Sequence, residues 1–113
     1  MSESTLTLEE SSAPWAEPWM ACPDAAENPA TRELQRECPV SHVLYRLPVL
    51  LIARRGDCDD FLFRLTDGTN RYAVVHLTWN VETDPKWPRT EIFASFDDFV
   101  ANRLRTDVAD WNL

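Results

Sequence analysis

The residues best suited to chemistry in this chain are its three cysteines, its two histidines and one run of aspartates. Cys58 and His76 are formally a nucleophile and a base, because the strand pairing expected below puts Cys58 near the strand end that holds His76. Cys58 stands among Asp57, Asp59 and Asp60, however, and negative neighbours raise the pKa of a thiol and weaken it as a nucleophile. We therefore expect a turn cysteine and a strand histidine, not a catalytic pair.

Other catalytic and metal-binding patterns do not occur in the sequence. It has no G-x-S-x-G, no H-E-x-x-H and no glycine-rich phosphate loop. Cys38-x-x-x-His42 is the one close pair of potential metal ligands, and no second pair completes a zinc site. The expectation is a protein that is not an enzyme and that holds no cofactor and no metal.

Charge and cysteine usage narrow the classes of partner. The net charge is −8, and residues 1–40, with eight acids against two arginines, carry −6 of it. Such a surface repels nucleic-acid phosphates and suits a basic protein partner. Three widely spaced cysteines fit free thiols in a reducing compartment better than a disulfide scaffold. No apolar run is long enough for a membrane span and the first residues do not resemble a secretory signal, so a cytoplasmic protein is expected.

One turn signal in the sequence predicts the strands that would position these residues. Asp67-Gly68 lies between two runs rich in aromatic and β-branched residues, which is typical of a hairpin. A two-residue turn would pair Arg64 with Arg71 and Leu62 with Ala73. The facing arginines are unfavourable, and a longer loop would move them apart. Together with an apolar run at 48–54, the sequence predicts strands near 48–54, 60–66 and 70–79, and 91–93 are candidates for a short fourth.

Two helices are predicted around this meander. Residues 95–110 are predicted to form a helix, which Ser95 is placed to cap with Asp98 three residues later. Its apolar stripe consists of Phe96, Phe99, Val100, Leu104, Val108 and Trp111. Residues 28–38 begin with Asn28 and a proline and end at another proline, which indicates an N-terminal helix. Residues 40–47 fit either further helical turns or an extended segment. The expected fold is α+β: an antiparallel three- to four-stranded meander with a C-terminal and an N-terminal helix.

The stretch from His76 to Leu104 resembles a pattern of small uncharacterised bacterial proteins. In that pattern H-L-T-W ends a strand, a W-P loop follows, and F-x-S-F begins a helix. The resemblance implies a bacterial cytoplasmic origin and no particular activity. Within the stretch we expect Trp79, Trp87 and Pro88 to pack as one aromatic cluster against Phe93 and Phe96.

The N-terminal third contains "APWAEPWMACP", residues 13–23, called here the Pro-Trp segment. Residues 1–27 are expected to be a largely extended or disordered acidic segment preceding one α+β domain at 28–113. A sheet that is apolar on both faces needs two covers, and the C-terminal helix supplies one. The second cover is the helix near 28–47, the Pro-Trp segment or a second copy of the chain. The Pro-Trp segment docks either on its own domain or on another chain.

These observations favour a small acidic protein-binding module, in concrete form an immunity or antitoxin-type protein that neutralises a basic toxin. The alternatives are a self-associating assembly protein, a homodimer through the Pro-Trp segment, and, last, a small enzyme using His76. The residues expected to bind the partner are Trp15, Trp19, Met20, Trp87, Asp57, Asp59 and Asp60.

Overall fold

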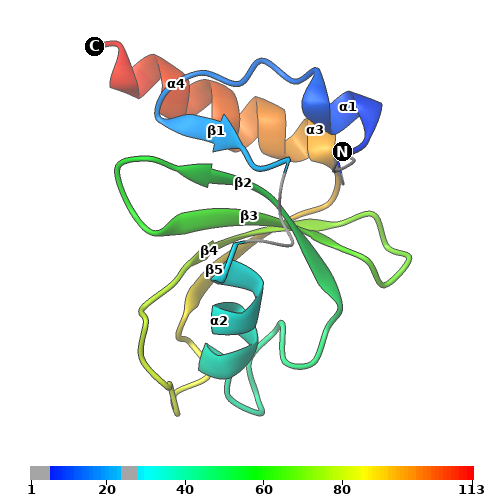
Figure 1. The fold of residues 1–113 in the computed structure, drawn as a ribbon, viewed down its shortest axis with the longest axis vertical. Helices are drawn as coiled ribbons and strands as arrows, with labels where there is room; N and C mark the ends of the chain where they lie inside the picture. The colour runs from blue at the N-terminus through cyan, green and yellow to red at the C-terminus, as the bar shows by residue number, and fades with distance from the viewer. Residues whose placement is uncertain (1–5, 24–27) are drawn as a thin grey trace.

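The computed structural model describes residues 6–23 and 28–113, which form an antiparallel sheet between two layers of helix and turn (Figure 1). The strands follow one another as neighbours in the order β1-β2-β3-β4-β5. They are β1 (Trp19–Ala21), β2 (Val49–Arg55), β3 (Asp60–Leu65), β4 (Tyr72–His76) and β5 (Arg89–Phe93). The predicted α+β meander is confirmed, and it has five strands because β1 joins one edge and β5 the other.

The hairpin between β3 and β4 differs from the prediction by one residue. Arg64 pairs with Tyr72 and Leu62 with Val74, so the loop is longer than two residues. Asn70 takes a left-handed backbone with φ 59° as does Gly68 with φ 90°. A shift of one residue moves every side chain of β4 to the other face of the sheet relative to β3. Phe61, Phe63 and Val75 therefore share one face.

That face is covered by α2 (Ala30–Glu37) and by the turns that follow it, below the sheet in Figure 1. The Asn28 side chain accepts a hydrogen bond from the Ala30 N–H, as the predicted helix start requires. Residues 39–47 are successive turns, neither of the predicted alternatives, and Leu44 enters the core from them. Of the three candidates for the second cover of the sheet, α2 and the turns after it therefore cover this face.

The opposite face is covered by the C-terminal helix and by the N-terminal segment together. The helix runs through α3 (Phe96–Phe99), a π-helical turn η2 (Val100–Leu104) and α4 (Arg105–Trp111), and Ser95 caps it as predicted. Trp19 and Trp15 pack on Phe99 of this helix. Their ring centroids lie 5.4 and 6.2 Å, respectively, from the centroid of the Phe99 ring. The Pro-Trp segment therefore docks on its own domain, of the two possibilities that the sequence allowed.

Residues 6–23, part of the segment predicted to be largely extended or disordered, contain the short helix α1 (Leu8–Ser11) as well as the strand β1. Residues 1–5 and 24–27 lie outside the described residues. A capping box on Thr7 begins α1, and the Glu10 carboxylate is fully buried. It accepts bonds at 2.8 and 3.0 Å from the Arg64 guanidinium and one from the Tyr72 hydroxyl. These bonds join the N-terminal segment to the middle of the sheet.

No helix in the described parts of the chain has the length and apolar character to cross a membrane.

Candidate functional site

Two of the tryptophans expected to bind a partner are instead part of the fold. Trp19 is 2% exposed, and its indole N–H donates to Asp107 at 2.8 Å. Trp15 is half-buried and donates to the Glu10 carbonyl. A side chain whose ring and donor are both satisfied inside the chain offers little to a partner. In the folded chain Trp19 therefore has almost no surface to offer a partner, and Trp15 keeps only a partial surface.

The three aspartates at the turn between β2 and β3 also differ in exposure. Asp60 is buried and bonds to His76 and Arg103, so in the folded chain its carboxylate is not presented to a partner. Asp59 is exposed, and Asp57 is exposed although Arg55 forms two bonds to its carboxylate and lowers its pKa. Met20 on edge strand β1 is also exposed.

The expected aromatic cluster of Trp79 and Trp87 with Phe93 and Phe96 does not form. Phe93 and Phe96 lie in the core that contains Trp19. Trp79 and Trp87 are 44% and 39% exposed, on the loop of residues 77–88 that connects β4 to β5. We call this loop the tryptophan loop. It carries a third exposed apolar side chain, Val81, and the turn after α2 adds Val40 and Val43.

Glu37, at the end of α2, holds the first half of the tryptophan loop. Its side chain is fully buried and accepts from the Thr78 N–H at 2.8 Å and from the Trp79 N–H at 2.7 Å. The Thr78 hydroxyl donates to the same carboxylate at 3.0 Å. Burial, with a bond to Glu33 as the next cause, raises the pKa of Glu37 to about 7. The anchor of the loop therefore changes its charge near neutral pH.

His42 holds the second half of the loop. Its Nδ1 accepts from the Leu44 N–H at 2.9 Å, so the neutral ring carries its proton on Nε2 and donates to the Pro88 carbonyl at 2.8 Å. His42 is itself buried. Because Glu37 and His42 belong to one short stretch of chain, both ends of the tryptophan loop are fixed to the same support.

The backbone of Trp79 is strained. Its φ is 60°, in the left-handed region that a bulky residue seldom occupies. The cost of such a conformation, about 1–2 kcal/mol, is tolerated only where surrounding bonds impose it. Here the bond from the Trp79 N–H to Glu37 does so, and the indole is left partly in solvent. Strain of this kind is concentrated at functional sites.

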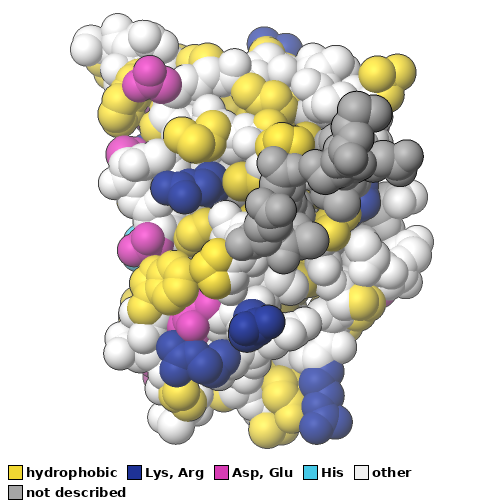
Figure 2. Space-filling view, in the orientation of Figure 1, with side chains coloured by type: hydrophobic (Ala, Val, Ile, Leu, Met, Phe, Trp, Pro, Cys, Tyr) yellow, Lys and Arg dark blue, Asp and Glu magenta, His cyan; other side chains and the backbone are white. Residues whose placement is uncertain are grey.

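Acidic residues lie at the same end of the sheet as the tryptophan loop. The Leu77 N–H donates to the Asp59 carbonyl at 2.9 Å, which places the β2–β3 turn beside the start of the loop. Figure 2 shows hydrophobic and acidic side chains side by side along the left of the molecule, where Figure 1 has the β2–β3 turn and the tryptophan loop. This end combines exposed indoles with carboxylates.

The residues considered for covalent or metal chemistry are not arranged for it. Burial raises the pKa of the Cys58 thiol, and burial together with Glu37 raises that of Cys38 to about 11, so neither is a ready thiolate. All three cysteines are free, as predicted. His76 bonds to Asp60 through Nδ1 at 2.7 Å. No group of three potential metal ligands occurs among residues 6–23 and 28–113.

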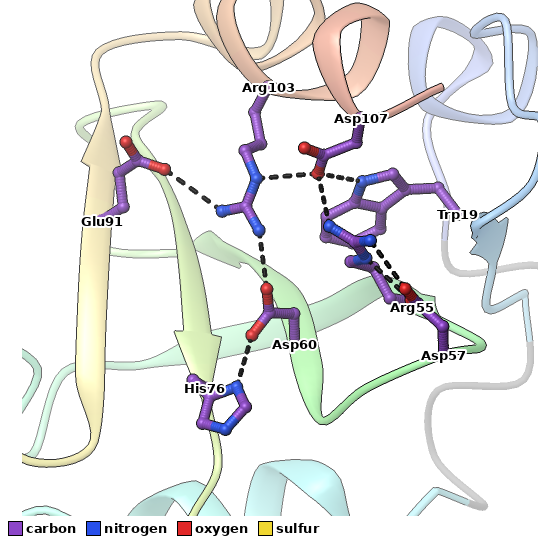
Figure 3. Close-up of polar contacts among 8 residues, drawn as sticks. All are labelled: Trp19, Arg55, Asp57, Asp60, His76, Glu91, Arg103 and Asp107. Carbon is purple, nitrogen blue, oxygen red and sulfur yellow. Dashed lines mark hydrogen bonds and ion pairs between the residues drawn. The ribbon is translucent and has the colours of Figure 1, made fainter. Parts of the chain in front are cut away.

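A polar network, absent from the sequence predictions, joins the sheet to the C-terminal helix (Figure 3). Arg103 in η2 bonds to Asp60 at 2.6 Å and to Asp107 at 2.7 Å, and its remaining nitrogen bonds to Glu91 at 3.2 Å. Asp107 also accepts from Trp19 and pairs with Arg55 at 3.1 Å. The sequence did not predict the role of Arg103, because its three partners are spread over 48 residues of chain.

Comparison with family models, with curated proteins and with solved structures finds no match to this chain.

Proposed function

We propose that this chain is a non-enzymatic protein-binding module, and that it engages a basic protein through the tryptophan loop and the neighbouring acidic turn. The observation that carries the proposal is Trp79. It is an indole 44% exposed, on a strained backbone whose N–H is held by a buried carboxylate. A large apolar side chain kept in solvent at a conformational cost is better explained by a partner than by stability of the free chain.

The composition of this end supports the same proposal. Tryptophan is enriched among the residues that dominate binding energy at interfaces, and it works best inside a rim that excludes water. Val81 is a further exposed apolar side chain on the tryptophan loop, and Val40 and Val43 are exposed on the turn that His42 joins to the end of the loop. Asp57 and Asp59 add negative charge beside it, and complementary charge raises the association rate with a basic partner. An immunity or antitoxin protein that neutralises a basic toxin is the most specific form of this function.

The test is affinity capture from the native host with matched variants. The wild-type chain, the double variant Trp79→Ala/Trp87→Ala and the control Trp111→Ala are immobilised at equal density. Trp111 is comparably exposed, at 47%, but lies on α4 near the C-terminus. We expect one basic protein to be retained in near-stoichiometric amount by the wild type and by Trp111→Ala, and to be lost from the double variant.

A charge variant separates the two contributions. Asp57→Asn/Asp59→Asn is expected to slow association several-fold at low salt and to leave dissociation nearly unchanged, because exposed charges act mainly on encounter. Surface plasmon resonance of the captured partner measures both rates. Equal retention of the same proteins by wild type and double variant contradicts the proposal. So does a wild-type dimer in light scattering that the double variant converts to a monomer, since that outcome assigns the loop to self-association.

A further inference from the structure

A pocket of about 520 Å³ opens on the side of the sheet that carries the C-terminal helix, beside the ends of β4 and β5. The strand register places Asp60, His76 and Arg89 in one row across β3, β4 and β5. Residues directly opposite one another on neighbouring strands project from the same face. Glu91 and Arg103 complete the charged lining. We call this the His76–Arg89 pocket.

Three of the five charged or titratable groups in the pocket are already satisfied by one another. The Arg103 guanidinium uses separate nitrogens for Asp60 and Glu91, and its third bonds to Asp107 outside the pocket. Both oxygens of Asp60 are engaged, one by Arg103 and one by His76. Arg103 thus offsets one of the two carboxylates in the lining, and Arg89 supplies the positive charge that matches the other.

The remaining two groups, His76 and Arg89, still have side-chain nitrogens without a hydrogen-bond partner in the described residues. His76 is oriented by its 2.7 Å bond to the Asp60 carboxylate, which holds a proton on Nδ1 and leaves Nε2 without a partner in the described residues. The backbone of Arg89 pairs with β4, but its side chain has neither a hydrogen bond nor an ion pair to any described residue. A guanidinium and an oriented imidazole thus line one pocket with bonding capacity to spare.

We propose that the His76–Arg89 pocket binds a phosphate group of a small molecule. The planar guanidinium of Arg89 offers paired N–H donors that match two phosphate oxygens. A third oxygen meets Nε2 of His76 through a single shared proton, which satisfies both groups whether the ring or the phosphate carries it. A carboxylate has two oxygens, so it can bond to Arg89 with both, but it has no separate oxygen and no proton of its own to offer Nε2. This site is separate from the tryptophan loop and goes beyond the proposed function.

The experiment is a titration with inorganic phosphate, and in a second arm with acetate, followed by the NMR signals of the histidine rings. His42 serves as an internal reference, because its two nitrogens are already bonded within the core. We expect phosphate to shift the His76 ring signals in a saturable manner and to leave those of His42 unchanged. Acetate is expected to bind at least about tenfold more weakly, since it forms one charge-assisted contact fewer.

Three variants decide whether the contact is specific. Arg89→Gln and His76→Gln are each expected to weaken phosphate binding about tenfold, the effect of losing one charge-assisted bond. Arg105→Gln is the matched control, because Arg105 is an exposed arginine on α4 outside the pocket. Thermal unfolding of each variant establishes that it is folded. Unmoved His76 signals, or equal weakening by Arg89→Gln and Arg105→Gln, overturn the proposal. Equal affinity for acetate overturns the assignment to phosphate.

Discussion

Four tryptophans of this chain form two groups, Trp15 with Trp19 and Trp79 with Trp87, which differ in their position in space. Trp15 and Trp19 each follow a proline, and Trp87 precedes one. Trp19 is closed into the core between the sheet and the helix, whereas Trp79 and Trp87 remain at the surface. The difference lies in what each segment is fixed to. The Pro-Trp segment continues into β1, which pairs with β2, while the tryptophan loop extends past the sheet and is fixed through its backbone by Glu37 and His42.

The comparison predicts that equal truncations at the two places have very different costs. Trp19→Ala removes a fully buried ring and a buried hydrogen bond, and is expected to lower the free energy of unfolding by about 3–5 kcal/mol. Trp87→Ala removes a ring already partly in water and is expected to cost less than about 1 kcal/mol. Urea unfolding followed by circular dichroism measures both. Similar losses for the two variants contradict the division into a structural and a functional pair.

Weakening the bonds between Glu10 and the sheet is expected to have the next largest effect on the free energy of unfolding. Glu10→Gln keeps the shape but removes the charge that Arg64 and Tyr72 share, and is expected to cost about 2 kcal/mol. Arg64 is partly exposed and can still reach water, which limits the loss. The same urea series measures it. As a control, Glu9→Gln alters an exposed neighbour in α1 and is expected to change stability by less than about 0.5 kcal/mol. Equal effects at the two positions would show that the buried carboxylate is not the anchor.

The free energy of unfolding is expected to fall as pH rises through the titration of Glu37, which bonds to the tryptophan loop. The pKa of Glu37 is raised in the folded chain to about 7 from an ordinary value of 4.5. A carboxyl with a raised pKa contributes its stability fully below pH 4.5 and loses it as pH rises through about 7. In Glu37→Gln this decline, on the order of 2 kcal/mol, is expected to vanish. Unfolding free energies of both proteins at pH 5, 6, 7 and 8 provide the measurement, and parallel curves would contradict the assignment.

The smallest effect expected isolates the strain at Trp79. Trp79→Ala keeps a side chain on the left-handed backbone, whereas Trp79→Gly removes the steric conflict. The glycine variant is therefore expected to be the more stable of the two by about 1 kcal/mol, the reverse of the usual order in an ordered chain. Differential scanning calorimetry of the pair measures this. Alanine as the more stable variant would show that the backbone at position 79 relaxes.

Local signals were sufficient for the helix starts and for the positions of β2, β3 and β4. Ser95 and Asn28 accept backbone bonds at the helix starts where the sequence placed them. The C-terminal stripe, in contrast, was predicted to include Trp111, which is exposed. A π-helical turn at 100–104 interrupts the regular period of the helix, although Leu104 and Val108 of the stripe still pack against the core. The same turn contains Arg103, the centre of the polar network. The spacing of apolar residues in the sequence did not predict this turn.

The sequence by itself determined the class of the fold, because strand alternation, helix capping and turn residues act over a few neighbours. It did not determine the register of β3 and β4, nor which tryptophans are buried. A two-residue turn would put Arg64 and Tyr72 on opposite faces, whereas the observed pairing puts them on one face, where Glu10 bonds to both. Glu10 lies 54 residues from Arg64 in the chain. The choice between registers thus depends on a contact that exists only once the tertiary structure has formed, and that contact also joins the chain just before the Pro-Trp segment to the sheet.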